Sequence, residues 1–296
     1  MSKQITCEIA FDEVMQVGES PLWSAREQSL YWVDIPAATV HRLRWPSRRH
    51  SSWKMPSDAA SIALAARGGL IVATRNAFIH LNTENGEQTA ICDTPYDTAT
   101  MRVNDGKVDA RGRFWVGTMY EPRDKQDAMM LCLERGQLRT VWQGGATVSN
   151  GLAFGPVAMY QADTTSHQIR RFGFNVDAGQ VGPGEVWLQF PQDKTQNYGG
   201  RPDGAAIDAN GNYWCAMFEG GRLLCIGGNA QILHEIQLPV RCPTMLAFGG
   251  PDLRTLFVTS ASRGRSAQEL ADYPASGKLL ALNLDVAGIP EPFYLD

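Results

Sequence analysis

The chain has 296 residues, of which 44% are hydrophobic and 20% are charged, and its formal net charge at pH 7 is -4. A mildly acidic chain without a basic stripe is not expected to bind nucleic acid, and the lack of an 18-residue apolar run excludes a membrane-spanning helix. The first eleven residues contain neither a long apolar core nor a small-residue cleavage pattern, so we expect no signal peptide and a cytoplasmic location.

The cysteines and histidines do not indicate a redox or metal site. The six cysteines have no paired spacing and most lie within apolar strand patterns, so we expect buried free thiols. The five histidines are scattered along the chain without metal-ligand spacing. Structural or exposed roles are therefore favoured for each of them.

A pair of aromatic or apolar residues recurs six times, and successive pairs begin 39, 44, 45, 54 and 43 residues apart. Repeats of about 40 to 50 residues, built from alternating strands with glycine, asparagine and aspartate between them, are typical of propeller blades. The sequence therefore predicts an all-β fold, with residues 1–296 forming a single six-bladed β-propeller domain of four-stranded antiparallel blades around a central channel. The pairs are Tyr31-Trp32, Leu70-Ile71, Phe114-Trp115, Met159-Tyr160, Tyr213-Trp214 and Leu256-Phe257.

In chain order, the alternating residues 5–11 are expected to pair with the last blade and close the ring, because closure removes exposed sheet edges. The polar segment 192–200 is predicted to be a mobile loop, and residues 265–276 a short helix ended by Pro274. The six blades are predicted at about 17–55, 58–96, 101–143, 147–191, 201–239 and 242–294.

The clearest repeat relates residues 102–119 to residues 201–217. Each segment reads as a strand, a tight turn ending in glycine, and an aromatic strand. Laying the turns and aromatic pairs together places Asp109 on Asp208 and Asn104 on Asp203.

Extending this register to all six units gives one equivalent position per blade at the start of its first long strand. The innermost strand of a propeller blade lines the channel, so these positions are predicted to form a ring at one end of it. Four of the six carry oxygen-bearing side chains of the kind that Ca²⁺, Mg²⁺ or Mn²⁺ prefers. The six positions are Glu19, Ala60, Asn104, Asn150, Asp203 and Thr244.

Asparagine or aspartate before glycine is also ordinary turn chemistry, and Asn150-Gly151 and Asp203-Gly204 fit that interpretation individually. Glu19, which precedes Ser20-Pro21, does not fit a common turn signal. Four oxygen donors in one channel-facing register therefore favour a site over a set of turns.

The motifs around these positions resemble those of the SMP-30/gluconolactonase/regucalcin-like (LRE) family of six-bladed, metal-dependent sugar lactonases. The resemblance extends from the first blade to the fifth, and the sixth fits as the closing unit. The motifs are GESPLW at 18–23, RVNDGK at 102–107, GTM at 117–119, SNGL at 149–152 and PDG at 202–204 with Asp208.

This resemblance implies that Glu19, Asn150 and Asp203 bind one divalent metal ion directly. Oxygen ligands favour Ca²⁺, with Zn²⁺, Mn²⁺, Mg²⁺ and Fe²⁺ as alternatives. Asp203 is the candidate catalytic base, sharing that role with a metal-bound hydroxide.

The resemblance also implies that Arg102, Asn104 and Glu121 bind the substrate, with Asn104 beside the metal and the other two holding sugar hydroxyls. Without the resemblance, a salt bridge at the strand edge is the favoured role for Arg102. The chain has no Gly-x-Ser-x-Gly motif, which disfavours an acyl-enzyme route.

The implied reaction is metal-dependent hydrolysis of a small-molecule sugar lactone to its aldonic acid, of gluconolactonase or arabinonolactonase type. Glucono-, galactono-, arabinono- and xylonolactone are the candidate substrates. The alternatives are a non-catalytic calcium-binding or scaffold propeller and a related hydrolase of non-sugar lactones or phosphotriesters, because the propeller fold hosts many functions.

Overall fold

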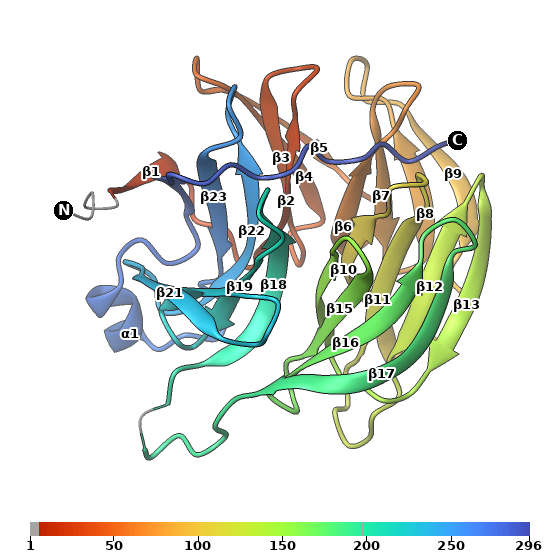
Figure 1. Ribbon diagram of the computed structural model, residues 1–296. Coiled ribbons are helices and arrows are strands. Elements are labelled where there is room, and N and C mark those ends of the chain that lie inside the picture. The colour runs from red at the N-terminus through yellow and green to blue at the C-terminus, as the bar shows by residue number, and fades with distance from the viewer. Residues whose placement is uncertain (1–5, 197) are drawn as a thin grey trace.

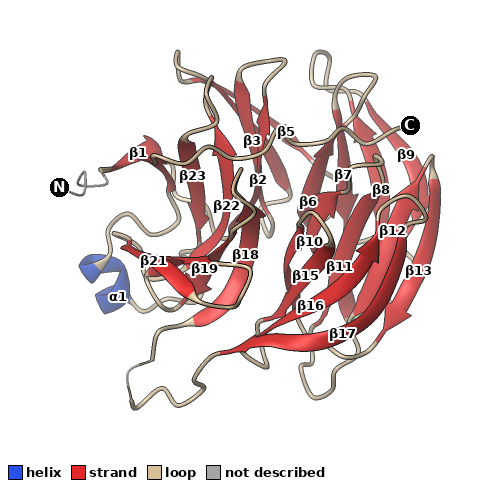
Figure 2. Ribbon diagram, viewed as in Figure 1, coloured by secondary structure: helices blue, strands red, loops and turns tan. Residues whose placement is uncertain are grey.

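The computed structural model describes residues 6–196 and 198–296 (Figure 1). Its 24 strands form six four-stranded antiparallel sheets arranged as the blades of a propeller (Figure 2). Each innermost strand contacts the innermost strand of the next blade, and the last of them contacts the first, so the ring is closed. The predicted six-bladed β-propeller is confirmed.

The blades follow the predicted boundaries closely. From the channel outward, the first three blades are β2 (Gly18–Ser24), β3 (Ser29–Asp34), β4 (Thr39–Arg44) and β5 (Arg49–Lys54); β6 (Ala59–Leu64), β7 (Leu70–Thr74), β8 (Ala77–Leu81) and β9 (Gln88–Asp93); and β10 (Met101–Val108), β11 (Phe114–Tyr120), β12 (Met129–Glu134) and β13 (Gln137–Gln143). The last three are β14 (Ser149–Phe154), β15 (Ala158–Asp163), β16 (Gln168–Asn175) and β17 (Gln180–Gln189); β18 (Arg201–Ile207), β19 (Tyr213–Phe218), β20 (Arg222–Ile226) and β21 (Ile232–Gln237); and β22 (Pro243–Gly249), β23 (Thr255–Ser260), β24 (Leu279–Asn283) and β1 (Cys7–Phe11).

The ring closes through the N-terminal strand, as predicted. β1 pairs antiparallel with β24, so the last blade takes three strands from the C-terminal part of the chain and one from the N-terminal part. Residue 5, the first residue of the predicted strand, lies outside the described residues. This pairing covers the edge that β24 would otherwise leave open.

The recurring aromatic and apolar pairs all lie in the second strand of their blades, where the neighbouring blades cover both faces. Trp32 and Trp115 are fully buried, and the Phe114 ring meets the Phe78 ring of the adjacent blade edge to face, at 6.1 Å between centroids. Burying a large apolar side chain contributes roughly 1.5–3 kcal/mol. The repeated pairs therefore supply much of the packing between blades.

The other irregular segments also follow the predictions in the main. The helix α1 (Ala267–Asp272) begins after the N-cap Ser266 and ends before Pro274. No strand or helix occurs in the described residues of segment 192–200.

All six cysteines are free thiols. Within the described ranges, no helix has the length and apolar character needed to cross a bilayer.

The C-terminal segment departs from the prediction, because the last blade ends with β24 at Asn283 and not near residue 294. Residues 284–296 leave the blade and cross one end of the propeller (Figure 1). Gly288 forms a β-bridge with Asp208, and Tyr294 forms one with Ala65 on the far side. Pro290 and Pro292 cannot donate ladder hydrogen bonds, so this stretch lies across the sheets and does not join one.

Candidate functional site

All six inner strands are bulged near the same register position. The pairing shifts after Glu19 in β2, after Ala59 in β6, after Val103 in β10, after Asn150 in β14 and after Pro202 in β18, and β22 shifts likewise. A bulge turns side chains away from the regular alternation of a strand and is frequent beside active sites. The six equivalent positions predicted from the sequence each border such a bulge or lie inside it.

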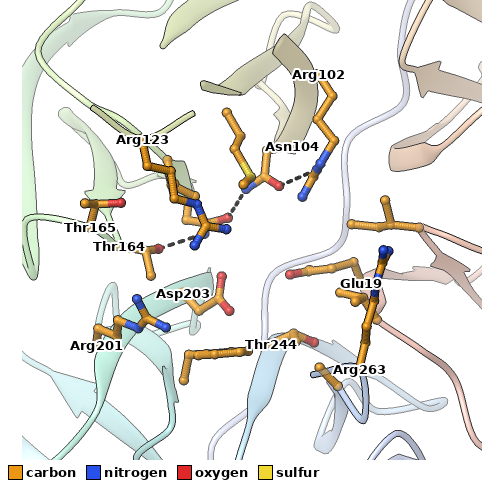
Figure 3. Close-up of a pocket in the computed structure, with 17 residues that line it drawn as sticks. Glu19, Arg102, Asn104, Arg123, Thr164, Thr165, Arg201, Asp203, Thr244 and Arg263 are labelled. Atoms are coloured by element: carbon orange, nitrogen blue, oxygen red, sulfur yellow. Dashed lines mark hydrogen bonds between the residues drawn. The ribbon is translucent and has the colours of Figure 1, made fainter. Parts of the chain in front are cut away.

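Five of these six side chains line one cavity of about 190 Å³ in the channel. In Figure 3, Glu19 and Asp203 point into this cavity from opposite sides, and Asn104 reaches it from a third direction. Arg102 also lines the cavity. The lining members of the predicted ring are Glu19, Asn104, Asn150, Asp203 and Thr244.

Asp203 is a buried carboxylate that the protein does not satisfy. Only 5% of the residue is exposed, and its side chain accepts no hydrogen bond from the described residues. Burial, and next the charge of Asp105, raise the pKa of Asp203 well above the ordinary aspartate value, while Arg201 and Arg102 lower it. Such a carboxylate is costly to bury unless a cation or proton neutralises it.

Glu19 is the second buried carboxylate, with 8% of the residue exposed. Its Oε2 accepts one hydrogen bond, from the Ser20 backbone N–H at 3.1 Å. Burial, followed by the charges of Asp203 and Asp105, raises the pKa of Glu19 well above its ordinary value. Two desolvated carboxylates at one cavity are the electrostatic environment that a divalent cation relieves.

A chain of hydrogen bonds fixes the orientation of the two amides. Arg102 Nη1 donates to Asn104 Oδ1 at 2.7 Å, and Asn104 Nδ2 donates to Asn150 Oδ1 at 2.6 Å. Asn150 Nδ2 then donates to Thr164 Oγ1 at 2.8 Å, whose hydroxyl donates to the Pro202 carbonyl at 2.7 Å. The bond to Thr164 fixes the orientation of the Asn150 amide, and the amide oxygen, which accepts from Asn104, keeps its second lone pair.

The donor set of Glu19, Asn150 and Asp203 fits a hard divalent cation, since it offers two carboxylates and one oriented amide oxygen. Among the residues that the structure describes, no group of three His, Cys, Asp or Glu side chains is arranged to hold a metal. The predicted set contains only two such side chains, so it would need the amide and water to complete a coordination shell. One carboxylate oxygen nearby, Asp105 Oδ1, is buried without a partner.

Glu121 lies beside the first cavity and not in it. It lines an adjoining cavity of about 550 Å³, which shares Arg102 with the first. Arg75 donates hydrogen bonds to both carboxylate oxygens of Glu121, at 2.8 Å and 3.1 Å, and also donates to Asp58 at 2.7 Å. Arg102 Nε is 3.8 Å from Glu121, so the strand-edge contact between them is loose.

Sequence reasoning missed several residues of the two cavities. The Arg75–Asp58 pair and Thr164 carry no repeat signal, because they lie outside the bulged register. Three further arginines line the first cavity. Arg123 and Arg263 lie on loops that only the fold brings together, whereas Arg201 is the register equivalent of Arg102, so the repeat could have identified it.

The comparisons with known proteins agree with this architecture. A 6-deoxy-6-sulfogluconolactonase of Pseudomonas putida is 41% identical over 296 residues, which cover 99% of both chains. A regucalcin of Xenopus laevis is 31% identical, over 96% of this chain and 97% of its own. A calcium-binding regucalcin of Agrobacterium tumefaciens has the same fold, with a TM-score of 0.92 at 23% identity and coverage of 98% and 97%.

The fold and the cavity define a six-bladed propeller with a cluster of buried oxygen donors in its channel. The family model described as SMP-30/Gluconolactonase/LRE-like region matches residues 17–262. The chain belongs to this family, and the resemblance seen in the sequence motifs is confirmed.

Proposed function

We propose that this chain hydrolyses a sugar lactone to the corresponding aldonic acid and that a divalent cation bound by Glu19, Asn150 and Asp203 is required. The observation that carries the proposal is the pair of buried carboxylates beside an oriented amide oxygen, with no protein cation bonded to Asp203 in the described residues. The lactonase class rests on the family and on the relative named as a lactonase. The cation and the substrate rest on the cavity.

The reaction adds water across the ring ester. The water oxygen bonds to the carbonyl carbon, the bond from that carbon to the ring oxygen breaks, and the ring oxygen leaves as a hydroxyl. A cation held by the three ligands would supply Lewis acidity at the carbonyl. Asp203 is the base that takes the proton from water and returns it to the leaving oxygen. Asp203 lines the cavity and is only 5% exposed, which favours this exchange over loss of the proton to solvent.

The other predicted residues orient the substrate. Arg102 lines both cavities and can donate to sugar hydroxyls while its Nη1 holds Asn104. Asn104 spends its amide hydrogens on Asn150 and on the Ser149 carbonyl, so its main effect is to position Asn150. Glu121, held by Arg75, offers a fixed carboxylate to a hydroxyl at the outer cavity.

The substrate class is an aldonolactone, with glucono-, galactono-, arabinono- and xylonolactone as members to compare. The 41% identical relative is named for a gluconolactone with a sulfonate at carbon 6, so that lactone belongs in the same panel. Polar lining at Arg102 and Glu121 favours these polyols over apolar lactones or phosphotriesters.

The test is lactone hydrolysis by chelator-treated protein, followed by acid release at constant pH, with Ca²⁺, Zn²⁺, Mn²⁺, Mg²⁺ or Fe²⁺ restored singly. We expect turnover to fall at least about a hundredfold on chelation and to return with one or two metals. The same metals should stabilise the protein by about 2.7 kcal/mol at one hundred times their Kd.

The control is Glu19→Gln, which should lose both the turnover and the stabilisation by metal. Full turnover in chelator would contradict the role of the cation. Stabilisation by Ca²⁺ without turnover of any lactone would instead favour a non-catalytic calcium-binding propeller.

A further inference from the structure

The two cavities form one continuous site with an inner and an outer part. Both are lined by Arg102, Arg123 and Arg263, together with three apolar residues. The inner part contains the oxygen donors Glu19 and Asp203, and the outer part contains none of the ring positions. A substrate whose reacting carbonyl reaches the donors therefore extends its other end toward the outer part.

The inner cavity carries an excess of positive charge. Four guanidinium groups line it against two carboxylates, although the chain as a whole has a net charge of -4. A divalent cation at the two carboxylates would offset their charge, so the four guanidinium groups would depend on other partners for neutralisation. The lining arginines are Arg102, Arg123, Arg201 and Arg263.

Protein partners account for two of these four. Arg102 donates to Asn104 Oδ1 and to the Val103 carbonyl. Arg201 lies 3.4 Å from the Glu219 carboxylate, which it shares with Lys194 and a further arginine. Glu219 therefore neutralises only part of the charge of Arg201.

Arg123 and Arg263 are different, because neither side chain donates a hydrogen bond or forms an ion pair with any residue that the structure describes. Both are exposed and both line the junction of the two cavities. In Figure 3 they approach from opposite sides of the labelled cluster. Arg123 also has a φ of 61°, a left-handed conformation that an arginine adopts at a cost of about 1 kcal/mol or more.

A solvated surface arginine would need no partner, but two arginines that are unpaired among the described residues and both line the shared part of two polar cavities can form a receptor for an anion. Guanidinium forks pair best with sulfonate, phosphate or carboxylate oxygens, to which they donate two hydrogen bonds at once. A neutral lactone offers only hydroxyls there. The positive opening of an acidic protein would also attract an anion from solution.

We propose that the site selects aldonolactones with an anionic substituent at the end away from the lactone carbonyl, and that Arg123 and Arg263 bind this substituent. The proposal rests on the proposed function and deepens it by naming a substrate class. It assigns the two arginines to specificity. They do not take part in bond breaking.

The test compares kcat/KM for neutral gluconolactone with that for its 6-phosphate, its 6-deoxy-6-sulfonate and glucarolactone, with spontaneous hydrolysis subtracted. We expect at least one anionic lactone to exceed gluconolactone by about thirtyfold or more, and the ranking identifies the anion. Arg123→Gln and Arg263→Gln should each reduce this preference about tenfold, mainly through KM. Arg49→Gln, an exposed arginine on β5 away from both cavities, should leave the preference unaltered.

Equal kcat/KM for neutral and anionic lactones would overturn the proposal while leaving lactonase function intact. A loss shared equally by both substrates in the two variants would also overturn it. If no lactone is turned over, the proposed function fails, and calorimetry with 6-phosphogluconate and gluconate still decides the anion site. Tighter binding of the phosphate that disappears in Arg123→Gln supports it, and equal binding refutes it.

Discussion

Asp203 lies near the start of β18 and Asp208 directly follows its last residue, and both are buried, with 5% and 1% exposed. Asp208 accepts four hydrogen bonds, from the backbones of Asn210 and Asn212, from the Asn212 amide and from Trp214 Nε1, at 2.9 to 3.0 Å. Asp203 accepts none from the described residues. Hydrogen bonds within the protein satisfy the Asp208 carboxylate, whereas the Asp203 carboxylate is available to a ligand.

The same structural carboxylate recurs two blades earlier. Asp109 accepts from the backbones of Arg111 and Arg113, from Arg113 Nε at 2.7 Å and from Trp115 Nε1 at 2.8 Å. It closes the turn that ends at Gly112, which has a φ of 77°. The aligned residues Asp109 and Asp208 thus each stabilise a turn and bind a tryptophan Nε1. The aligned residues Asn104 and Asp203, in contrast, line the cavity.

The two ends of the channel differ in the same way. At the end opposite the oxygen donors, residues 289–292 of the C-terminal segment help to line a separate cavity of about 250 Å³ with apolar strand ends. Its charged pair, Lys107 and Glu291, is satisfied internally at 2.5 Å. The protein neutralises the charged pair at that end, whereas at the site end Asp203 accepts no hydrogen bond from the described residues.

The largest expected effect comes from Asp203→Asn, which removes the carboxylate and keeps its shape. We expect kcat/KM for the preferred lactone to fall about 10⁴-fold, which corresponds to about 5.4 kcal/mol. Because folding raises the pKa of Asp203, its ionised form opposes folding at neutral pH, so the neutral amide should not reduce the free energy of unfolding of the metal-free protein. Steady-state kinetics and urea unfolding measure the two quantities. If the Asp203→Asn variant turned the lactone over within tenfold of the parent rate, Asp203 would not be the catalytic base.

The reverse pattern is expected for Asp109→Asn, which leaves the buried guanidinium of Arg113 without its carboxylate. Breaking a buried pair in this way costs about 3 to 5 kcal/mol of unfolding free energy, and kcat should be kept by the folded fraction. The matched control is Asp177→Asn, whose partner Arg111 is on the surface, with side-chain exposures of 71% and 61%. That change should cost less than about 1 kcal/mol. Equal losses in the two variants would contradict the structural role of Asp109.

A smaller effect concerns His41, a buried group that the protein satisfies only in its neutral form. Burial, then the charges of His50 and Lys54, lower the pKa of His41 to about 4 from 6.5. The unfolded chain binds the proton more readily, so the stabilising contribution is complete above pH 6.5 and is lost as the pH falls from 6.5 toward 4. We expect the free energy of unfolding to fall by about 3 kcal/mol over this range through this residue.

Urea unfolding between pH 7 and pH 4.5 measures that sensitivity. His41→Gln should flatten the decline, and His234→Gln, at an exposed position, should not. Identical slopes for the parent and His41→Gln would show that other groups carry the acid dependence. The Nδ1 of His41 lies 3.0 Å from His50 Nε2, a contact between residues nine apart that the histidine spacing did not predict.

The sequence by itself determined the propeller, the approximate boundaries of its first five blades and the ring register. It could do so because the same local pattern recurs six times. The pattern consists of an aromatic or apolar pair that is buried between blades, a tight turn and an inner strand that begins at the ring position. The ring positions such as Asn150 and Asp203 could be identified for the same reason, since equivalent positions in a closed repeat meet at one end of the axis.

The tertiary structure alone decided the features that lie outside the repeat. The C-terminal segment beyond Asn283 crosses the ring because β1, from the other terminus, takes the edge of β24. Loops from different blades pair Glu121 with Arg75 and place Arg123 and Arg263 beside both cavities. Such contacts join residues far apart in the chain, and no local pattern encodes which loops will face each other. The oxygen ring and Arg102 therefore follow from the sequence, and the positions of Arg123 and Arg263 beside them follow from the fold.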